Sequence, residues 1–242
     1  MLTKGECRKM NRLSISWMNI AAFNLILLFL SGCAPVTLKT VDLQPLIATT
    51  GTTVNSGSFG FCSGEGKTPS TTFSAPAETV MVGYDDFFRA GKPPFACDDV
   101  RVSVFRGGVK FDVSQFDAIA SAEFWLDTTK SISRSDGKLM ETSTPISYAN
   151  RLCMGTEIFS SKMLCDYSML LPVGETISVV VSDQVRDWIS MRRNNFGFVL
   201  TGPRSEFSAQ TPPRDNDAKI SWYSNFRLRI TYEPALNFRM AQ

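Results

Sequence analysis

An aromatic residue between two carboxylates is the arrangement in this chain best suited to contact a sugar. Glu123, Trp125 and Asp127 alternate with the apolar residues Phe124 and Leu126, so on a β-strand the first three share one face. An exposed indole can stack on a sugar ring, and the flanking carboxylates can accept hydrogens from its hydroxyl groups. The same alternation also fits a strand whose Trp125 face is buried against a second sheet. Both interpretations stay open at this point, and the three residues are candidate ligand-binding residues.

Two arginines near the C-terminus form a second candidate. Arg227 and Arg229 alternate with Leu228 and Ile230, which predicts a strand with both guanidinium groups on a solvated face. Such a basic stripe could contact an acidic sugar. The alternative interpretation is an ordinary solvated strand face without a ligand.

Four aspartates in two adjacent pairs are candidates for calcium, the only cofactor considered; these are Asp85, Asp86, Asp98 and Asp99. Calcium takes 6–8 oxygen ligands in flexible geometry, but the chain lacks the spacing of an EF-hand loop. Paired carboxylates can also cleave glycosides. Neighbours on a strand point in opposite directions, however, and we expect no catalytic residues and no enzyme activity.

The chain contains no histidine, which excludes Ser-His-Asp and Cys-His catalysis and histidine-containing zinc sites. Its 25 basic and 23 acidic residues are not concentrated as in nucleic-acid-binding proteins. We therefore expect no nucleic-acid partner.

The first 33 residues have the order of a secretory signal. Basic residues come first, an apolar run follows over 20–30, and small residues precede Cys33. An uncleaved membrane helix is the alternative interpretation, but this run of eleven residues is shorter than the roughly 20 that span a bilayer. Removing this segment leaves 21 basic and 22 acidic residues, so the mature chain is close to neutral.

The tetrapeptide Leu30-Ser31-Gly32-Cys33 resembles the lipobox of bacterial lipoproteins. The resemblance implies a signal peptide over 1–32, cleavage before Cys33, and attachment of diacylglycerol and an acyl chain such as palmitate to that cysteine. It further implies a cell-envelope protein held to the membrane by lipid. Because Ala34 stands where aspartate usually signals retention in the inner membrane, the outer membrane is favoured.

Four cysteines remain in the predicted mature chain beside the lipidated one: Cys62, Cys97, Cys153 and Cys165. An even number in an exported protein predicts disulfides. Of the three possible pairings we favour the most local one, Cys62–Cys97 with Cys153–Cys165. The second bridge would close a loop of about a dozen residues and contribute about 3 kcal/mol. A four-cysteine zinc site is the alternative, but the close Cys-x-x-Cys spacings are missing.

The mature chain divides into a linker and a domain. Residues 33–58 are rich in Thr, Ser and Gly, which predicts a flexible linker between the lipid and the folded part. From 59 to 242 short β-branched runs alternate with turn residues, and we expect strands near 80–84, 100–105, 108–113, 118–127, 176–181, 196–200 and 226–232. One helix is predicted with Ser182 or Asp183 as its N-cap and with Val185, Trp188 and Ile189 on its core face. The pattern predicts an all-β jelly-roll sandwich with one short helix.

Several segments resemble the DNRLRE domain family. Residues 181–188 and 195–200 resemble its helix-and-strand signature, while 110–114, 119–126 and 226–232 are similar to its other strands. Ser182-Asp183 and Asn225-Phe226 depart from its pattern. The resemblance spans residues 75–233 and implies a carbohydrate-binding-module-like jelly roll of the usually non-catalytic kind found on bacterial surfaces.

The expected molecule is therefore a lipid-anchored envelope protein with a non-catalytic binding domain for polysaccharide or for a partner protein. The alternative is a structural or assembly lipoprotein that docks to other envelope proteins, and a polysaccharide-degrading enzyme comes last.

Overall fold

The computed structural model describes residues 37–60, 70–92, 97–135, 137–141, 150–155, 165–202 and 216–234. The chain divides into two compact units, Met1–Thr37 and Leu38–Gln242. Within the described part of the second unit, the elements are β1 (Lys39–Leu43), β2 (Ile47–Gly60), β3 (Ser70–Phe73), β4 (Val80–Arg89), β5 (Cys97–Lys110), β6 (Ser121–Ser135), β7 (Lys138–Glu141), β8 (Arg151–Gly155), β9 (Cys165–Leu170), β10 (Thr176–Val180), α2 (Ser182–Ile189), β11 (Phe198–Thr201) and β12 (Ala218–Tyr232).

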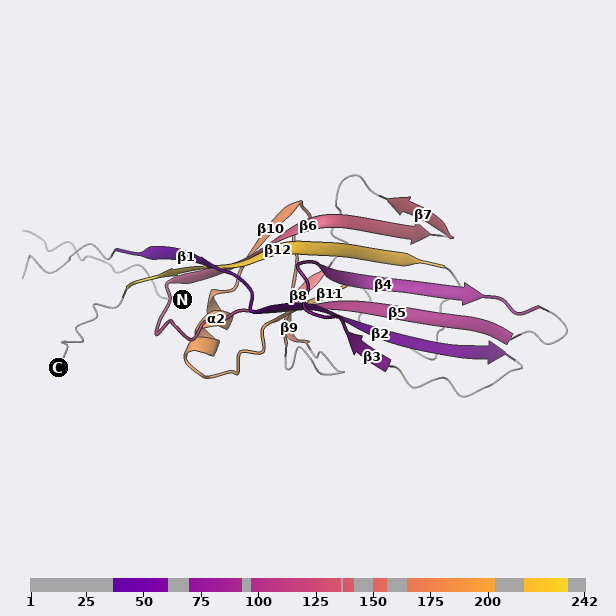
Figure 1. The fold of residues 1–242 in the computed structure, drawn as a ribbon, viewed down its shortest axis with the longest axis horizontal. Coiled ribbons are helices and arrows are strands. Elements are labelled where there is room, and N and C mark those ends of the chain that lie inside the picture. The colour runs from indigo at the N-terminus through magenta and orange to yellow at the C-terminus, as the bar shows by residue number, and fades with distance from the viewer. Residues whose placement is uncertain are drawn as a thin grey trace, which may run out of the picture. The chain divides into compact units, whose positions relative to one another are not determined.

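All the strands of the described residues belong to one antiparallel sheet that divides into two layers (Figure 1). Strand β5 pairs with β2 along one edge. Along its other edge, the part of β5 up to Phe105 pairs with β4, and the part from Arg106 pairs with β11. In the same way β12 pairs with β6 on one edge, and with β4 and then β1 on the other. Because β4 begins at Val80, it separates β5 from β12 over only part of their length. Beyond it the sheet opens into the layers β10-β6-β12-β1 and β2-β5-β11-β8-β9.

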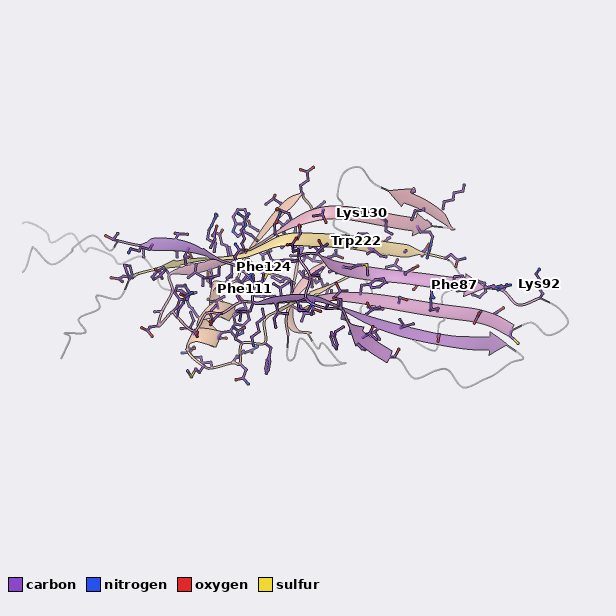
Figure 2. The ribbon with its side chains drawn as sticks, in the orientation of Figure 1. Phe87, Lys92, Phe111, Phe124, Lys130 and Trp222 are labelled. Atoms are coloured by element: carbon purple, nitrogen blue, oxygen red, sulfur yellow. The ribbon has the colours of Figure 1, made fainter. Side chains whose placement is uncertain are left out.

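Aromatic side chains fill the space between the two layers. Phe124 on β6 packs against Phe198 on β11, with ring centroids 4.9 Å apart, and Phe111 lies edge-on to Phe124 at 5.9 Å. Figure 2 shows Phe111 and Phe124 together in this part of the molecule. Helix α2 adds Trp188, whose ring centroid lies 4.9 Å from that of Phe198. The predicted all-β sandwich with one short helix is confirmed, as is the core position of Trp188, and its two layers are parts of one continuous sheet.

Glycines occupy the junction where the layers diverge. Gly83 on β4 has φ +137°, and a Cβ there would lie 1.9 Å from the carbonyl oxygen of Lys219 on β12. A Cβ on Gly202, which follows β11, would lie 2.6 Å from the Cα of Gly83. Two backbones meet here with no room for a side chain between them, and only glycine allows that approach.

The predicted linker over 33–58 is wrong from Lys39 onward, and so is the predicted start of the domain at 59. Strand β1 pairs with β12 through five residues, and β2 pairs with β5 along its whole length. Ala48 and Thr49 are buried in the sheet. Threonine and valine favour strands as strongly as serine and glycine favour linkers, and the mixed composition concealed the strands. Positions 33–36 lie outside the described residues.

The predicted strand segments are found, but two of them belong to a single strand. The segment expected at 100–105 and the first part of that expected at 108–113 are joined through Gly107 into β5, which ends at Lys110, so residues 111–113 lie beyond the strand. A Cβ on Gly107 would lie 2.2 Å from a methyl carbon of Val80, so this glycine permits a close approach of β4 and does not interrupt the strand.

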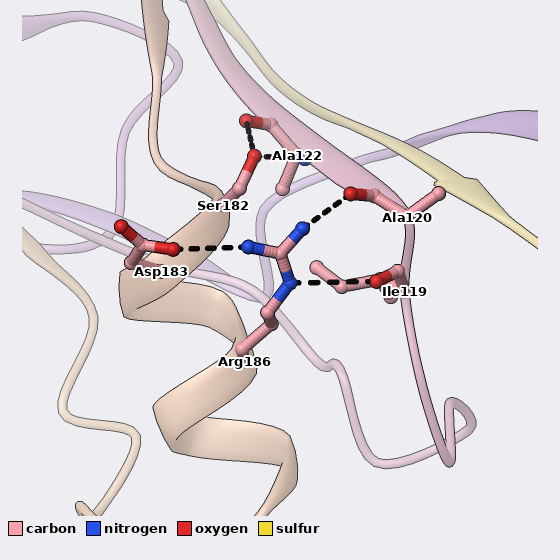
Figure 3. Close-up of polar contacts among 6 residues, drawn as sticks. All are labelled: Ile119, Ala120, Ala122, Ser182, Asp183 and Arg186. Carbon is pink, nitrogen blue, oxygen red and sulfur yellow. Dashed lines mark hydrogen bonds and ion pairs between the residues drawn. The ribbon is translucent and has the colours of Figure 1, made fainter. Parts of the chain in front are cut away.

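Helix α2 forms where the sequence predicts it, but with a different N-cap residue. The N-cap residue is Val181, which makes no side-chain capping bond. The hydroxyl of Ser182 instead exchanges hydrogen bonds with the backbone of Ala122 at the start of β6 (Figure 3). Arg186 donates to the carbonyl oxygen of Ala120. The polar side of the helix is thus fixed to the start of β6 and to the residues just before it, while Val185 is buried in the core.

Candidate functional site

The outer face of the layer β10-β6-β12-β1 brings the predicted ligand-binding residues together. In the ladder between β6 and β12, Trp125 lies opposite Arg227 and Glu123 lies opposite Arg229. Asp127 follows on the same face of β6. We call these five residues the Trp125 face. Their strand neighbours, which include Phe124, Leu126 and Leu228, are fully buried on the other side, so the alternation turns the Trp125 face outward.

The indole of Trp125 is held by its cross-strand neighbours. The guanidinium carbon of Arg229 lies 4.9 Å from the ring centroid and that of Arg227 lies 5.7 Å from it. The indole N–H donates to a carboxylate oxygen of Glu123 at 3.1 Å. Both cations are attracted to the ring by the negative charge on its face. The ring orientation is therefore fixed within the protein, and the tryptophan is half-buried.

Arg229 is itself positioned by a residue of β1. Its guanidinium donates two hydrogen bonds to the carboxylate of Asp42, at 2.8 and 3.0 Å. This hydrogen bonding, with the positive charge, holds the pKa of Asp42 below its ordinary value, although desolvation opposes the shift. The same bonds raise the pKa of Arg229. Asp42 was not identified as a site residue from the sequence because it lies in the predicted linker. The alternation of Asp42 with the apolar residues Val41 and Leu43 is the pattern that could have indicated a strand there.

Asp127 is held from both neighbouring strands. One carboxylate oxygen accepts a hydrogen bond from the hydroxyl of Thr176 on β10, and the other accepts one from the side-chain amide of Asn225 on β12, both at 2.9 Å. Asn225 has φ +52° and lies at an irregularity in the ladder. An ionised carboxylate has about four lone-pair sites, so Asp127 retains acceptor capacity toward solvent.

The Trp125 face combines three kinds of group within one strand pair. It offers an aromatic ring, guanidinium donors and carboxylate acceptors, all presented by rigid strands. Sugar hydroxyl groups both donate and accept hydrogen bonds, and the C–H faces of sugar rings are apolar. The arrangement therefore suits a hydroxyl-rich ligand that lies flat against the sheet.

The four aspartates considered for calcium are dispersed. Asp85 forms an ion pair with Arg134, whereas the side chain of Asp86 is buried on the opposite face of β4. Asp98 accepts a hydrogen bond from a backbone N–H at 3.0 Å, and Asp99 is exposed. The described residues contain no group of three or more potential metal ligands. The calcium hypothesis is wrong for this set, because adjacent strand residues point apart.

The predicted cysteine bridges lie partly outside the described residues. Cys62 belongs to the undescribed part, as does the side chain of Cys165. The register places Gly60, two residues before Cys62, opposite Cys97, and it places Gly155 opposite Cys165. Cys97 and Cys153 each have an interaction partner. The predicted pairing of Cys62 with Cys97 and of Cys153 with Cys165 stays a prediction. Cys33 also lies outside the described residues, so its lipidation stays a prediction too.

Comparison with family models, with curated proteins and with solved structures finds no match to this chain. Among the described residues, no helix has the length and apolar character needed to cross a membrane.

Proposed function

We propose that residues 38–234 form a non-catalytic polysaccharide-binding domain, and that the Trp125 face is its binding surface. The observation that carries the proposal is the placement of Trp125, two arginines and two carboxylates on one outward face of one layer. The pairing of β6 with β12 and the contacts among these side chains already hold them in place. A ligand can therefore contact them without movement of the strands. Preorganisation of this kind reduces the entropic cost of binding.

The proposal places this domain on a lipid anchor in the cell envelope, with the outer membrane as its site. The order of the N-terminal segment and the tetrapeptide ending at Cys33 support this part. The similarity of residues 75–233 to the DNRLRE family supports a binding role, and membership of that family is itself part of the proposal. Labelling of cells with a clickable palmitate analogue tests the anchor: the wild type is labelled, and Cys33→Ser is not.

The disulfides Cys62–Cys97 and Cys153–Cys165 belong to the same proposal. An oxidising envelope compartment allows them, and the register brings residues 60 and 97 opposite each other. Mass spectrometry of the unreduced protein tests the pairing. Peptides crosslinked in any other combination, or four free thiols, contradict it.

A second candidate function is docking to another envelope protein. Strand β10 forms one end of the main strand order, and its segment Thr176–Val180 contains no charged residue. Val180 is exposed over 67% of its surface. Natural edge strands usually carry charges or prolines that discourage pairing with another strand, so this edge is suited to receive one.

Affinity electrophoresis of the full-length protein in detergent, in gels that contain neutral or acidic polysaccharides, tests the proposed binding. We expect retardation by at least one polysaccharide, and its loss in Trp125→Ala and Arg227→Ala. Arg101→Ala is the matched control, because Arg101 also lies over an aromatic ring, that of Phe87 at 5.8 Å. Thermal melting of each variant excludes unfolding as the cause. Absence of retardation in every gel contradicts polysaccharide binding and favours the docking function.

A further inference from the structure

A second pairing of a tryptophan with a cation lies on the same two strands as the Trp125 face. Trp222 on β12 is directly opposite Lys130 on β6, and the Lys130 ammonium nitrogen is 5.7 Å from the centroid of the indole. Figure 2 shows the two side chains together on the neighbouring strands. Lys130 is exposed and Trp222 is half-buried.

Two irregularities in the ladder keep both tryptophans on one face. The register shifts between Trp222 and Tyr223, and again between Ser224 and Arg227. As a result Tyr223 and Phe226 both point inward, where they are buried at 0% and 2% exposure. Trp222 and Arg227 both remain on the outer side. In a regular strand, residues five positions apart would lie on opposite faces, so these shifts are what align the two sites.

The surface between the tryptophans is polar and open. Thr129 and Asn225 are exposed there, and Asp127 lies between them. Trp125 and Lys130 are five positions apart on β6, which corresponds to roughly 16 Å along the strand. Beyond Trp222 the outer side of β12 is closed, since Ile220 and Ala218 are buried. The open surface thus extends from the Trp125 face along the strands and ends at Trp222.

We propose that this surface is one elongated binding track with two subsites, the Trp125 face and the Lys130–Trp222 pair, and that it takes an extended polysaccharide chain along the strands. This inference rests on the proposed function and deepens it. It specifies that the ligand is an extended polysaccharide and that one monosaccharide does not fill the site. A single sugar ring cannot touch two tryptophans separated by this distance. The polar middle of the track supplies hydrogen-bonding groups for the sugars between them.

Chain length is the property that distinguishes a track from a single site. When two subsites bind parts of one ligand, the second contact becomes intramolecular and raises the affinity without changing the first. A short oligosaccharide that reaches only Trp125 gains nothing from Trp222. A ligand that spans both subsites is expected to bind at least tenfold more tightly, and this factor corresponds to about 1.4 kcal/mol.

The test measures affinity against oligosaccharide length for the full-length protein in detergent. Two series are used, from disaccharide to octasaccharide: a neutral one from β-1,4-xylan and an acidic one from polygalacturonate. We expect the wild type to show a rise of at least tenfold with length in one of them. Trp222→Ala and Lys130→Ala are expected to remove the rise and to leave the affinity for the shortest bound member within twofold. Trp222→Phe, which keeps a ring, is expected to retain most of it.

Each other outcome has a separate meaning. Lys130 is exposed, so its replacement tests the second subsite even where Trp222→Ala fails to fold. An unchanged length dependence in Lys130→Ala and in a folded Trp222→Ala overturns the track, and loss of binding in Trp125→Ala then still supports the proposed function. Absence of wild-type binding to both series overturns the track, and absence in the polysaccharide gels as well overturns the proposed function.

Discussion

Replacing Gly83 by alanine tests the idea that the sheet divides at this residue. The backbone has φ +137° here, and an added Cβ would lie 1.9 Å from the carbonyl oxygen of Lys219. The unfavourable φ costs about 1–3 kcal/mol. Moving β12 away to make room would break one or two ladder hydrogen bonds, at about 0.5–1.5 kcal/mol each. We therefore expect a total loss of about 1.5–6 kcal/mol, a large fraction of the roughly 5–15 kcal/mol of a typical domain.

Gly137→Ala is the matched control for this experiment. Gly137 also has a positive φ, +75°, but an added Cβ would meet no atom within 4 Å. Its replacement therefore carries only the conformational cost, about 1–2 kcal/mol. Urea denaturation followed by circular dichroism measures both variants. The melting temperature of Gly83→Ala is expected to fall by roughly 10 °C. Equal losses in the two variants would refute the proposed close contact between β4 and β12.

Three further predictions concern the core, the N-terminal strands and the Asp42–Arg229 pair. Phe124→Ala is expected to cost about 3–5 kcal/mol in urea denaturation, because a fully buried ring between the layers is lost; a cost below 1 kcal/mol would contradict this core. A fragment that starts at residue 59 is expected to lack cooperative unfolding, whereas one that starts at 37 retains it, because only the longer fragment contains β1 and β2; cooperative melting of the shorter fragment would restore the linker interpretation. The lowered pKa of Asp42 means that its stabilising contribution is present above the unfolded value near pH 4 and is lost as the pH falls through the folded value. Asp42→Asn is therefore expected to reduce stability more at pH 7 than at pH 2, and an equal reduction at both would contradict the ion pair.

The sequence could predict which side chains share a face, since that direction is a local property of a strand. Glu123, Trp125 and Asp127 are found together for this reason, and Arg227 and Arg229 are found together likewise. It could not predict that these two strands are neighbours, because residues 136–217 lie between β6 and β12. Nor could alternation within β12 predict that Trp222 shares the face of Arg227, since two irregularities in the ladder intervene.

The errors made from the sequence also have physical causes. Thr-rich segments suit both linkers and strands, and the choice depends on whether a partner such as β5 offers an open edge. Gly107 and Gly108 suggested a break, yet the first of them allows β4 to approach. Asp85 and Asp86 suggested a shared ligand, but alternation along β4 separates them. In the first two cases the deciding contact comes from a distant part of the chain, whereas the alternation that separates the two aspartates is local.

The early start of β1 limits how far the proposed anchor can hold the domain from the bilayer. Strand β1 begins at Lys39, only six positions after Cys33, and six extended residues reach at most about 20 Å. Asp42, at the edge of the Trp125 face, belongs to that same first strand. A lipid on Cys33 would therefore hold Lys39, where the sheet begins, no farther than about 20 Å from the lipidated residue.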